Sequence, residues 1–265
     1  MEILKSILLG AVQGLTEFLP ISSSGHLILT RDLLKINFAN GLAFDAVLQL
    51  ATTLAIIVYF RKDVFLLART FVKIIFKKPV ESEDKKLFWF VTFATIPAVI
   101  LGLLLENSME TIFRSSILVA MTLIAGSAVM YFAEKRTGHH SELSNEKSFY
   151  LGLFQSLALI PGMSRSGMTI SGGLFLGLKR EVAVRMSFVM AVPILIGSGL
   201  KQFLDLLCSG GFTAIGIDLL LGSLTSFFVG LFAINFLIKF LKNNSMNFFI
   251  WYRVVLAIII LIVTL

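Results

Sequence analysis

The chain has 265 residues, of which 57% are hydrophobic and only 15% are charged. A soluble domain is usually about half apolar and about a quarter charged, so this composition excludes an ordinary soluble protein and indicates a polytopic membrane protein. The net charge of +7 would suit nucleic acid, but the cations lie in short loops between apolar runs, so we expect no nucleic acid partner. Cys208 is the only cysteine, which excludes an internal disulfide and a site of several thiolates.

The chain begins with a short apolar segment that contains Gln13 and Glu17 and has no small-residue cleavage site, so we expect it to stay in the mature protein. Six near-continuous apolar runs follow, each about 18 to 20 residues long, which is enough to cross ~30 Å of hydrocarbon. We therefore predict an all-α fold with about six spanning helices. The runs are 42–60, 87–105, 115–133, 182–200, 219–238 and 248–265.

Lysine and arginine are distributed unevenly between the loops. Sixteen of the 23 lie in four loops, and only four lie in the three loops that would face the other side. By the positive-inside rule the first set is cytoplasmic. The first set is 61–86, 134–148, 178–185 and 239–247, and the second is 31–41, 106–114 and 201–218.

Two segments, Gly10 to His26 and Gly152 to Thr169, match each other without gaps at an offset of 142 positions. Both place hydroxyl residues, glycines and a proline inside apolar sequence. Irregular backbone at membrane depth is tolerated only where protein or a water-filled cavity satisfies its polar groups, so these breaks predict the working site. The identical pairs are Gly10 and Gly152, Gln13 and Gln155, Leu15 and Leu157, Ser22 and Ser164, Ser24 and Ser166, and Gly25 and Gly167.

The two halves are predicted to be inverted in the membrane. The run 42–60 passes from the charge-poor to the charge-rich side, and its counterpart 184–202 passes the opposite way. Inverted repeats are typical of many transport folds, whose sites lie near the midplane in broken helices. A chance likeness between apolar sequences is the alternative. We expect one integral membrane domain over 1–265, with halves at about 1–133 and about 149–265.

The breaks also predict two re-entrant helical hairpins. Residues 149–181 begin and end on the cytoplasmic side, and the pieces on either side of Pro161 to Gly167 are too short to span. The inverted repeat then predicts a matching hairpin over 1–31 from the external side, although its first arm is long enough for a full span. The two tips would meet in the interior.

Glu17 is the acid well inside an apolar stretch, and Arg165 is the cation flanked on both sides by re-entrant sequence. A charge at the bilayer centre costs at least ~2.5 kcal/mol, so each should have a partner or a ligand. A simple ion pair across the repeat axis is one interpretation. A phosphate site is the other, because Arg165 offers a planar fork of donors and both breaks open a helix whose free N–H groups attract anions. The residues predicted to bind substrate are Gln13, Ser22, Ser24, Ser164, Ser166, Gly167 and Thr169.

Four side chains are candidates for chemistry: Glu17, Ser23, His26 and Arg165. Ser23 would attack phosphorus, with His26 or Glu17 taking its proton. Gln13 and Glu17 share a helix face at a spacing of four, so their oxygens could hold a divalent cation, Mg or Ca. A structural hydrogen bond from Gln13 to the backbone, and a cation-bound water as the nucleophile, are the respective alternatives.

The two motifs resemble those of a known family. Gln13 to His26 resembles its (Glu/Gln)-x-x-x-Glu segment with the following Ser-Ser-x-Gly-His, and Pro161 to Thr169 resembles the Pro-Gly-x-Ser-Arg-Ser-x-x-Thr signature of the undecaprenyl-diphosphate phosphatase (bacitracin-resistance) family. The resemblance covers essentially the whole chain.

This resemblance implies an integral enzyme of the bacterial cytoplasmic membrane that hydrolyses undecaprenyl diphosphate and recycles the lipid carrier for cell-wall synthesis. It also implies a divalent cation and a site reached from the external face. The expected partners are a polyprenyl diphosphate and membrane lipids, and a homodimer stays open. A transporter of the phosphorylated lipid carrier or of a phosphate-type anion is the competing hypothesis, because inverted repeats with broken helices also occur in transporters.

Overall fold

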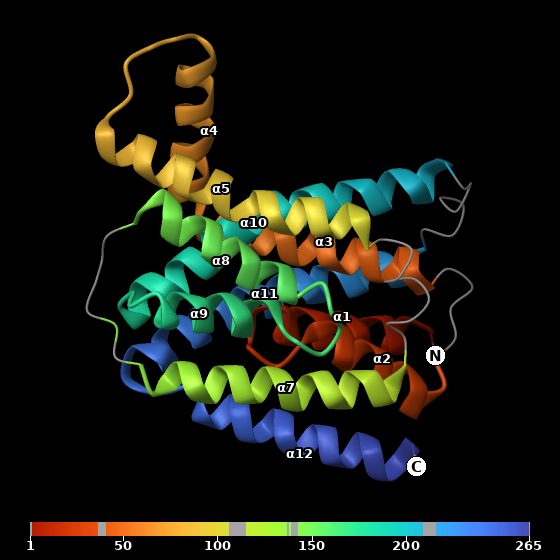
Figure 1. Cartoon of the computed structure of the whole chain (residues 1–265). Coiled ribbons are helices and arrows are strands. Elements are labelled where there is room, and N and C mark those ends of the chain that lie inside the picture. Colours follow the sequence, from red (N-terminus) through yellow and green to blue (C-terminus); the bar gives the residue numbers. More distant parts are fainter. Residues whose placement is uncertain are drawn as a thin grey trace.

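The computed structural model describes residues 2–36, 41–105, 115–136, 138, 143–208 and 216–264. The regular elements of these residues are helices, labelled as in Figure 1. They are α1 (Glu2–Phe18), α2 (Ser23–Leu34), α3 (Gly41–Tyr59), α4 (Arg61–Ile75), α5 (Ser82–Leu104), α7 (Ser116–Glu134), α8 (Asn145–Leu157), α9 (Arg165–Phe175), α10 (Arg180–Cys208), α11 (Ile217–Asn243) and α12 (Asn247–Thr264).

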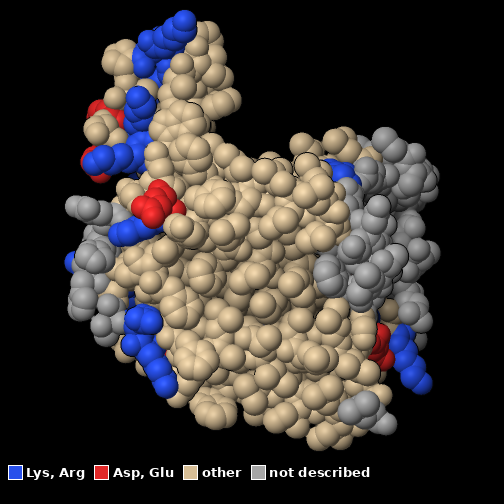
Figure 2. Space-filling model, viewed as in Figure 1, with Lys and Arg blue, Asp and Glu red and all other residues tan. Residues whose placement is uncertain are grey.

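The prediction of an all-helical membrane protein is confirmed. Within the described residues five helices, α5, α7, α10, α11 and α12, are long and apolar enough to cross a membrane, and α3 carries a shorter apolar stretch, Phe44–Tyr59. Each of the six predicted runs falls on one of these helices. Figure 2 shows the same pattern on the surface, where an uncharged band separates Lys and Arg gathered at the two ends of the helices. This band is the part that lipid covers.

The charge-rich loops lie together at one end of the helices. In Figure 1 this end holds the C-terminal ends of α3, α7 and α11 and the beginnings of α5, α8, α10 and α12. A bidentate ion pair of Arg180 with Glu134 joins α10 to α7 there, and the backbone N–H of Met246 donates to Glu134 at 2.9 Å. Both chain termini lie at the opposite end. Of the predicted charge-poor loops, 106–114 lies outside the described residues.

Two helical hairpins enter the molecule from opposite ends. The pair α8 and α9 starts from the charge-rich end, and the pair α1 and α2 starts from the end with the termini (Figure 1). The helices α8 and α9 have 13 and 11 residues, so neither reaches across ~30 Å at ~1.5 Å per residue. The hairpin tips meet near the centre, as the inverted repeat predicts.

Each hairpin packs its first arm on a helix of the other half of the chain. α1 packs on α11, and α8 packs on α5. Glycine allows the close approach in both places, since a Cβ on Gly14 would lie 2.6 Å from the Ser226 carbonyl oxygen and one on Gly152 would lie 2.7 Å from that of Ala94. The halves are therefore interlocked, and each supplies the groove for the other's hairpin.

Candidate active site

The two helix breaks have the same local geometry. Ser22 and Ser164, which correspond at the offset of 142, are the N-caps of α2 and α9 and have φ values of 76° and 71°. Each Oγ accepts the N–H three residues on, from Gly25 at 3.4 Å and from Gly167 at 3.3 Å. A positive φ outside glycine is strained and persists only where the surroundings enforce it. The sequence repeat is thus also a repeat of backbone conformation.

The two tips are joined by a direct hydrogen bond. The backbone N–H of Gly162 donates to Ser22 Oγ at 3.2 Å. Gly162 has a φ of 94°, and a Cβ there would collide with the hydroxyl of Thr122, which donates to the Pro161 carbonyl at 2.5 Å. Glycine is required at this position by both conformation and space.

Glu17 lies at the meeting point of the two hairpins. Its Oε1 accepts from Arg165 Nη2 at 3.0 Å, and its Oε2 accepts from Ser23 Oγ at 2.7 Å and from Gln13 Nε2 at 3.2 Å. Ser23 and Arg165 correspond at the offset of 142 and are the first residues of α2 and α9. One carboxylate therefore bonds to equivalent positions of both halves.

Two nitrogens of the Arg165 guanidinium are donors without a partner in the part of the chain that the structure describes. Its side chain is 10% exposed, yet Nε and Nη1 have no hydrogen-bond partner among the described residues. A buried donor without a partner costs ~1–3 kcal/mol, and an anion in front of the two nitrogens would remove that cost. The ion pair with Glu17 thus uses only part of this side chain, and the rest can bind a phosphate.

His26 makes two hydrogen bonds, and neither is to the Ser23 side chain. Its Nδ1 lies 2.7 Å from the Ser22 carbonyl oxygen, which only accepts, so Nδ1 carries a proton. Nε2 lies 2.8 Å from the Tyr252 hydroxyl oxygen, within hydrogen-bond distance, and the two rings stack. From the sequence, either His26 or Glu17 could take the proton of Ser23. In the structure the Ser23 hydroxyl donates to Glu17.

The other predicted hydroxyl residues differ in exposure between the two breaks. Ser24 is exposed and Ser23 is half-buried, whereas Ser164 and Ser166 are buried. Their pairing is nevertheless the same, since the hydroxyl oxygens of Ser22 and Ser24, like those of Ser164 and Ser166, lie 3.3 Å apart. The break that precedes α2 is the accessible one.

Thr169 supports the site from behind. Its side chain is fully buried, and its hydroxyl donates to the Arg165 carbonyl at 2.8 Å and lies 2.5 Å from the Ser187 hydroxyl of α10. These contacts fix the first turn of α9 against α10. Thr169 was predicted to bind substrate, but the structure gives its hydroxyl to protein groups.

Arg253 of α12 is the functional candidate that sequence reasoning missed. Its side chain is fully buried, and it donates from Nη1 to the Pro20 carbonyl at 3.3 Å and from Nη2 to the Gly162 carbonyl at 2.9 Å. Pro20 and Gly162 correspond at the offset of 142, so this guanidinium holds the same carbonyl of both breaks. Its Nε donates to Ser127 Oγ of α7 at 3.1 Å. The available signal was a cation inside the apolar run 248–265, which by itself indicates a functional residue.

A divalent cation would find few protein ligands here. The described residues contain no group of three or more His, Cys, Asp or Glu side chains arranged to hold a metal. Glu17 and Gln13 offer one carboxylate and one amide. This set fits Mg²⁺, which commonly takes one or two carboxylates and completes its shell with water and substrate phosphates.

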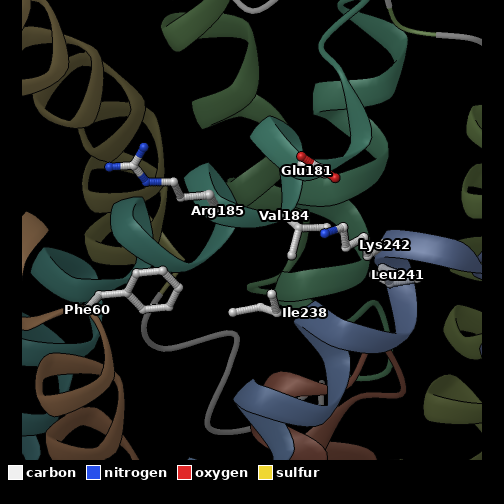
Figure 3. A pocket seen from close by; sticks show the side chains of 7 residues that line it. All are labelled: Phe60, Glu181, Val184, Arg185, Ile238, Leu241 and Lys242. Carbon is white, nitrogen blue, oxygen red and sulfur yellow. The ribbon is translucent and has the colours of Figure 1, made fainter.

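A separate pocket of about 330 Å³ lies at the charge-rich end (Figure 3). In that figure the guanidinium of Arg185 points away from Lys242, and it is ion-paired with Asp63 of α4. The pocket includes none of the predicted site residues, so we do not assign the chemistry to it. Its lining residues are Phe60, Glu181, Val184, Arg185, Ile238, Leu241 and Lys242.

Comparisons with known proteins agree with the motifs. The family described as "Bacitracin resistance protein BacA" matches residues 6–259. A protein of Methanosphaera stadtmanae named undecaprenyl-diphosphatase is 39% identical and covers 100% of this chain and 99% of its own length. Proteins with the same name from Corynebacterium glutamicum and Mycolicibacterium smegmatis are 41% and 42% identical, covering 97% and 98% of this chain and 89% and 96% of their own lengths.

Proposed function

Because this chain belongs to the bacitracin resistance family BacA, we propose that it is an undecaprenyl-diphosphatase, which hydrolyses undecaprenyl diphosphate to undecaprenyl phosphate and inorganic phosphate. This activity recycles the lipid carrier for cell-wall synthesis. The observation that carries the proposal is the position of the Ser23 hydroxyl, 2.7 Å from a carboxylate whose other oxygen holds Arg165. A nucleophile, a base and a phosphate-binding cation thus lie within one cluster.

The diphosphate binds between the two helix starts. The first backbone N–H groups of a helix have no partner within the helix and attract anions, and Arg165, whose Nε and Nη1 have no partner within the described ranges, is itself the first residue of α9. Two buried guanidinium groups, Arg165 and Arg253, outnumber the single carboxylate of Glu17, so the site carries a net positive charge that suits an anionic substrate.

Catalysis proceeds by phosphoryl transfer to Ser23. Its Oγ attacks the terminal phosphorus while Glu17 Oε2 takes the hydroxyl proton. The bond from this phosphorus to the bridging oxygen breaks, and undecaprenyl phosphate leaves with the electron pair. Glu17 gives the hydroxyl proton up to solvent before the second step. Water then attacks the phosphoserine phosphorus while Glu17 takes a proton from the water and passes it to the departing Ser23 Oγ, which releases inorganic phosphate. His26 orients the turn before Ser23 through its bond to the Ser22 carbonyl.

Gln13 and Glu17 would hold the divalent cation, Mg or Ca, together with the bound diphosphate. The cation would neutralise charge on the phosphate oxygens. An attacking water in place of Ser23 is the alternative route. Single-turnover reactions quenched in acid distinguish the two, because the proposed route labels Ser23 with phosphate, whereas an unlabelled Ser23 and appreciable activity in Ser23→Ala would exclude it.

We place the site toward the external side of the bacterial cytoplasmic membrane. Two observations support this orientation: the hairpin that carries Glu17 and Ser23 enters from the charge-poor end, and its break is the more exposed one. The polyprenyl chain stays in the bilayer, since each CH₂ contributes about 0.8 kcal/mol to its burial there.

Phosphate release by purified protein in detergent tests the function directly. A micelle has no two sides, so a transporter would release nothing, whereas a phosphatase turns over lipid diphosphate. We expect Glu17→Gln to lower the rate by roughly 10²- to 10⁴-fold, the usual contribution of a general base. Activity that persists in Glu17→Gln, or an inactive wild-type protein, would contradict the proposal.

A further inference from the structure

The helix α4 lies across the direction of the spanning helices. In Figure 1 it leaves the charge-rich end of the molecule and projects beside the beginning of α5, whereas α3, α5, α7 and α12 run roughly parallel to one another. It packs chiefly on α5, with smaller contacts to α3 and α10. With the spanning helices crossing a bilayer, α4 lies along its surface.

The side of α4 that faces away from the protein is apolar. Phe65, Val72 and Ile75 are 70%, 50% and 56% exposed, and Ala68 between them is also exposed. The spacing of these four positions places them in one row along the helix. Thr70 on the opposite side is buried against the protein. α4 therefore has one face for the protein and a second apolar face that the described residues leave uncovered.

A row of cations runs beside this apolar row. Lys62, Arg69 and Lys73 recur at helical spacing, about 100° around the axis from the apolar row. No ion pair joins any of the three to a carboxylate in the described part of the chain. The acid of this helix, Asp63, is paired with Arg185. Figure 2 shows Lys and Arg gathered on the projecting part of the molecule.

We propose that α4 is an interfacial helix that binds anionic phospholipids in the leaflet at the charge-rich end. The row of Phe65, Ala68, Val72 and Ile75 enters the boundary with the acyl chains, and Lys62, Arg69 and Lys73 lie at the level of the lipid phosphates. The charge decides the kind of lipid: a zwitterionic surface would bury the apolar row equally well, but it has no net negative charge to attract the three cations. This lipid site is separate from the catalytic cluster.

Quenching by brominated lipid tests the proposal in the full-length protein. A bimane label on Ala68→Cys, in a Cys208→Ser background, is placed in single-protein nanodiscs of phosphatidylcholine. A small fraction of brominated phosphatidylglycerol or of brominated phosphatidylcholine is then added. We expect the anionic lipid to be enriched beside the label by about fivefold or more, since a single Lys or Arg near an anionic surface contributes roughly that factor. Equal quenching by the two lipids would overturn the proposal.

Charge-matched variants show whether α4 itself is responsible. Replacing Lys62, Arg69 and Lys73 with Gln should abolish the preference. Replacing three other exposed cations at the same end with Gln should leave the preference for anionic lipid intact. These are Lys179, Lys239 and Lys242. Both variants should release phosphate in detergent at the wild-type rate, which shows that they are folded. If the label is quenched by neither lipid and is instead shielded when two proteins share a disc, the face contacts a second copy and the proposal is wrong.

Discussion

Glu17 connects the two halves of the molecule through a single side chain. Its two oxygens receive Ser23 from one helix start and Arg165 from the equivalent start in the other half. The repeat alone would make these positions alike, but the sequence has diverged to a hydroxyl at one and a guanidinium at the other. Because of that divergence, only the start of α2 carries the nucleophile, whereas the equivalent start of α9 carries the cation.

Gln13 is the residue at which the proposed cation can be tested. In Gln13→Glu the amide that donates to Glu17 is replaced by a second carboxylate, so the two like charges repel each other without a cation and hold one more tightly. We expect the unfolding temperature to fall in chelator and to rise more steeply with added Mg²⁺ than in the wild type, with half-maximal activity at lower Mg²⁺. An unchanged response to Mg²⁺ by both measurements would place the cation elsewhere.

Arg253 acts as a positioning residue, because it contacts both breaks and not the reacting atoms. In Arg253→Lys the charge is kept, but one ammonium cannot bond to the Pro20 and Gly162 carbonyls with the same reach. We expect kcat to fall roughly 10- to 100-fold with a smaller change in KM, since misplaced groups slow the chemical step. Stability should fall by ~1–3 kcal/mol for each carbonyl left without a partner. Equal losses in kcat and in substrate affinity would indicate direct contact with substrate.

At the scale of helices, the close contact of α1 with α11 holds the first hairpin in place. Gly14 of α1 faces Gly230 and the Ser226 carbonyl of α11, and Ser226 in turn donates to the Leu48 carbonyl at 3.1 Å. Three helices therefore meet beside Gly14, where a side chain larger than a hydrogen atom does not fit. The position of Glu17, one turn further along α1, depends on this contact.

Gly14→Ala tests that dependence against a matched control. Its Cβ would lie 2.6 Å from the Ser226 oxygen, so the helices must separate, which costs ~1–3 kcal/mol of unfolding free energy. Gly197→Ala in α10 has nothing within 4 Å of the new Cβ and should stabilise its helix by ~0.5–1 kcal/mol. Thermal unfolding in detergent measures both. Equal stability of the two variants would show that the α1–α11 contact is loose.

At the scale of the whole molecule, the inverted arrangement brings hairpins from opposite ends to one point. Because the first arm of each hairpin packs on the other half, neither break can form its site by itself. The hydrogen bond from Gly162 to Ser22 and the two bonds from Arg253 tie the tips together. The site therefore lies inside protein, away from lipid, as polar backbone at that depth requires.

The orientation of the molecule is tested with two single cysteines in a Cys208→Ser background. Lys78→Cys lies at the charge-rich end and Thr264→Cys lies close to the C-terminus at the opposite end, and both positions are exposed. A membrane-impermeant maleimide added to intact cells should label Thr264→Cys and not Lys78→Cys, because cation-rich loops stay in the cytoplasm. Labelling of both in lysed cells is the control. The reverse pattern would place the site on the cytoplasmic side.

The sequence by itself determined the helical class, the six apolar runs, the two breaks and the end of the molecule that carries the cations. These features are local, because helix length, hydropathy and loop charge are read along the chain without knowledge of contacts. The offset of 142 also identified which residues are equivalent, and the apolar surroundings of Glu17 and Arg165 marked both as charges that need partners.

Only the tertiary structure decided how the site is assembled. Three sets of contacts depend on which helices pack together. They are the hydrogen bond of Ser23 to Glu17, that between His26 and Tyr252, and those of Arg253 to the carbonyls of both breaks. His26 and Tyr252 are 226 positions apart, and nothing in the composition of α12 says that it lies beside the hairpin tips. Packing between distant helices fixes these contacts because a buried polar group must take whichever partner the neighbouring helix offers.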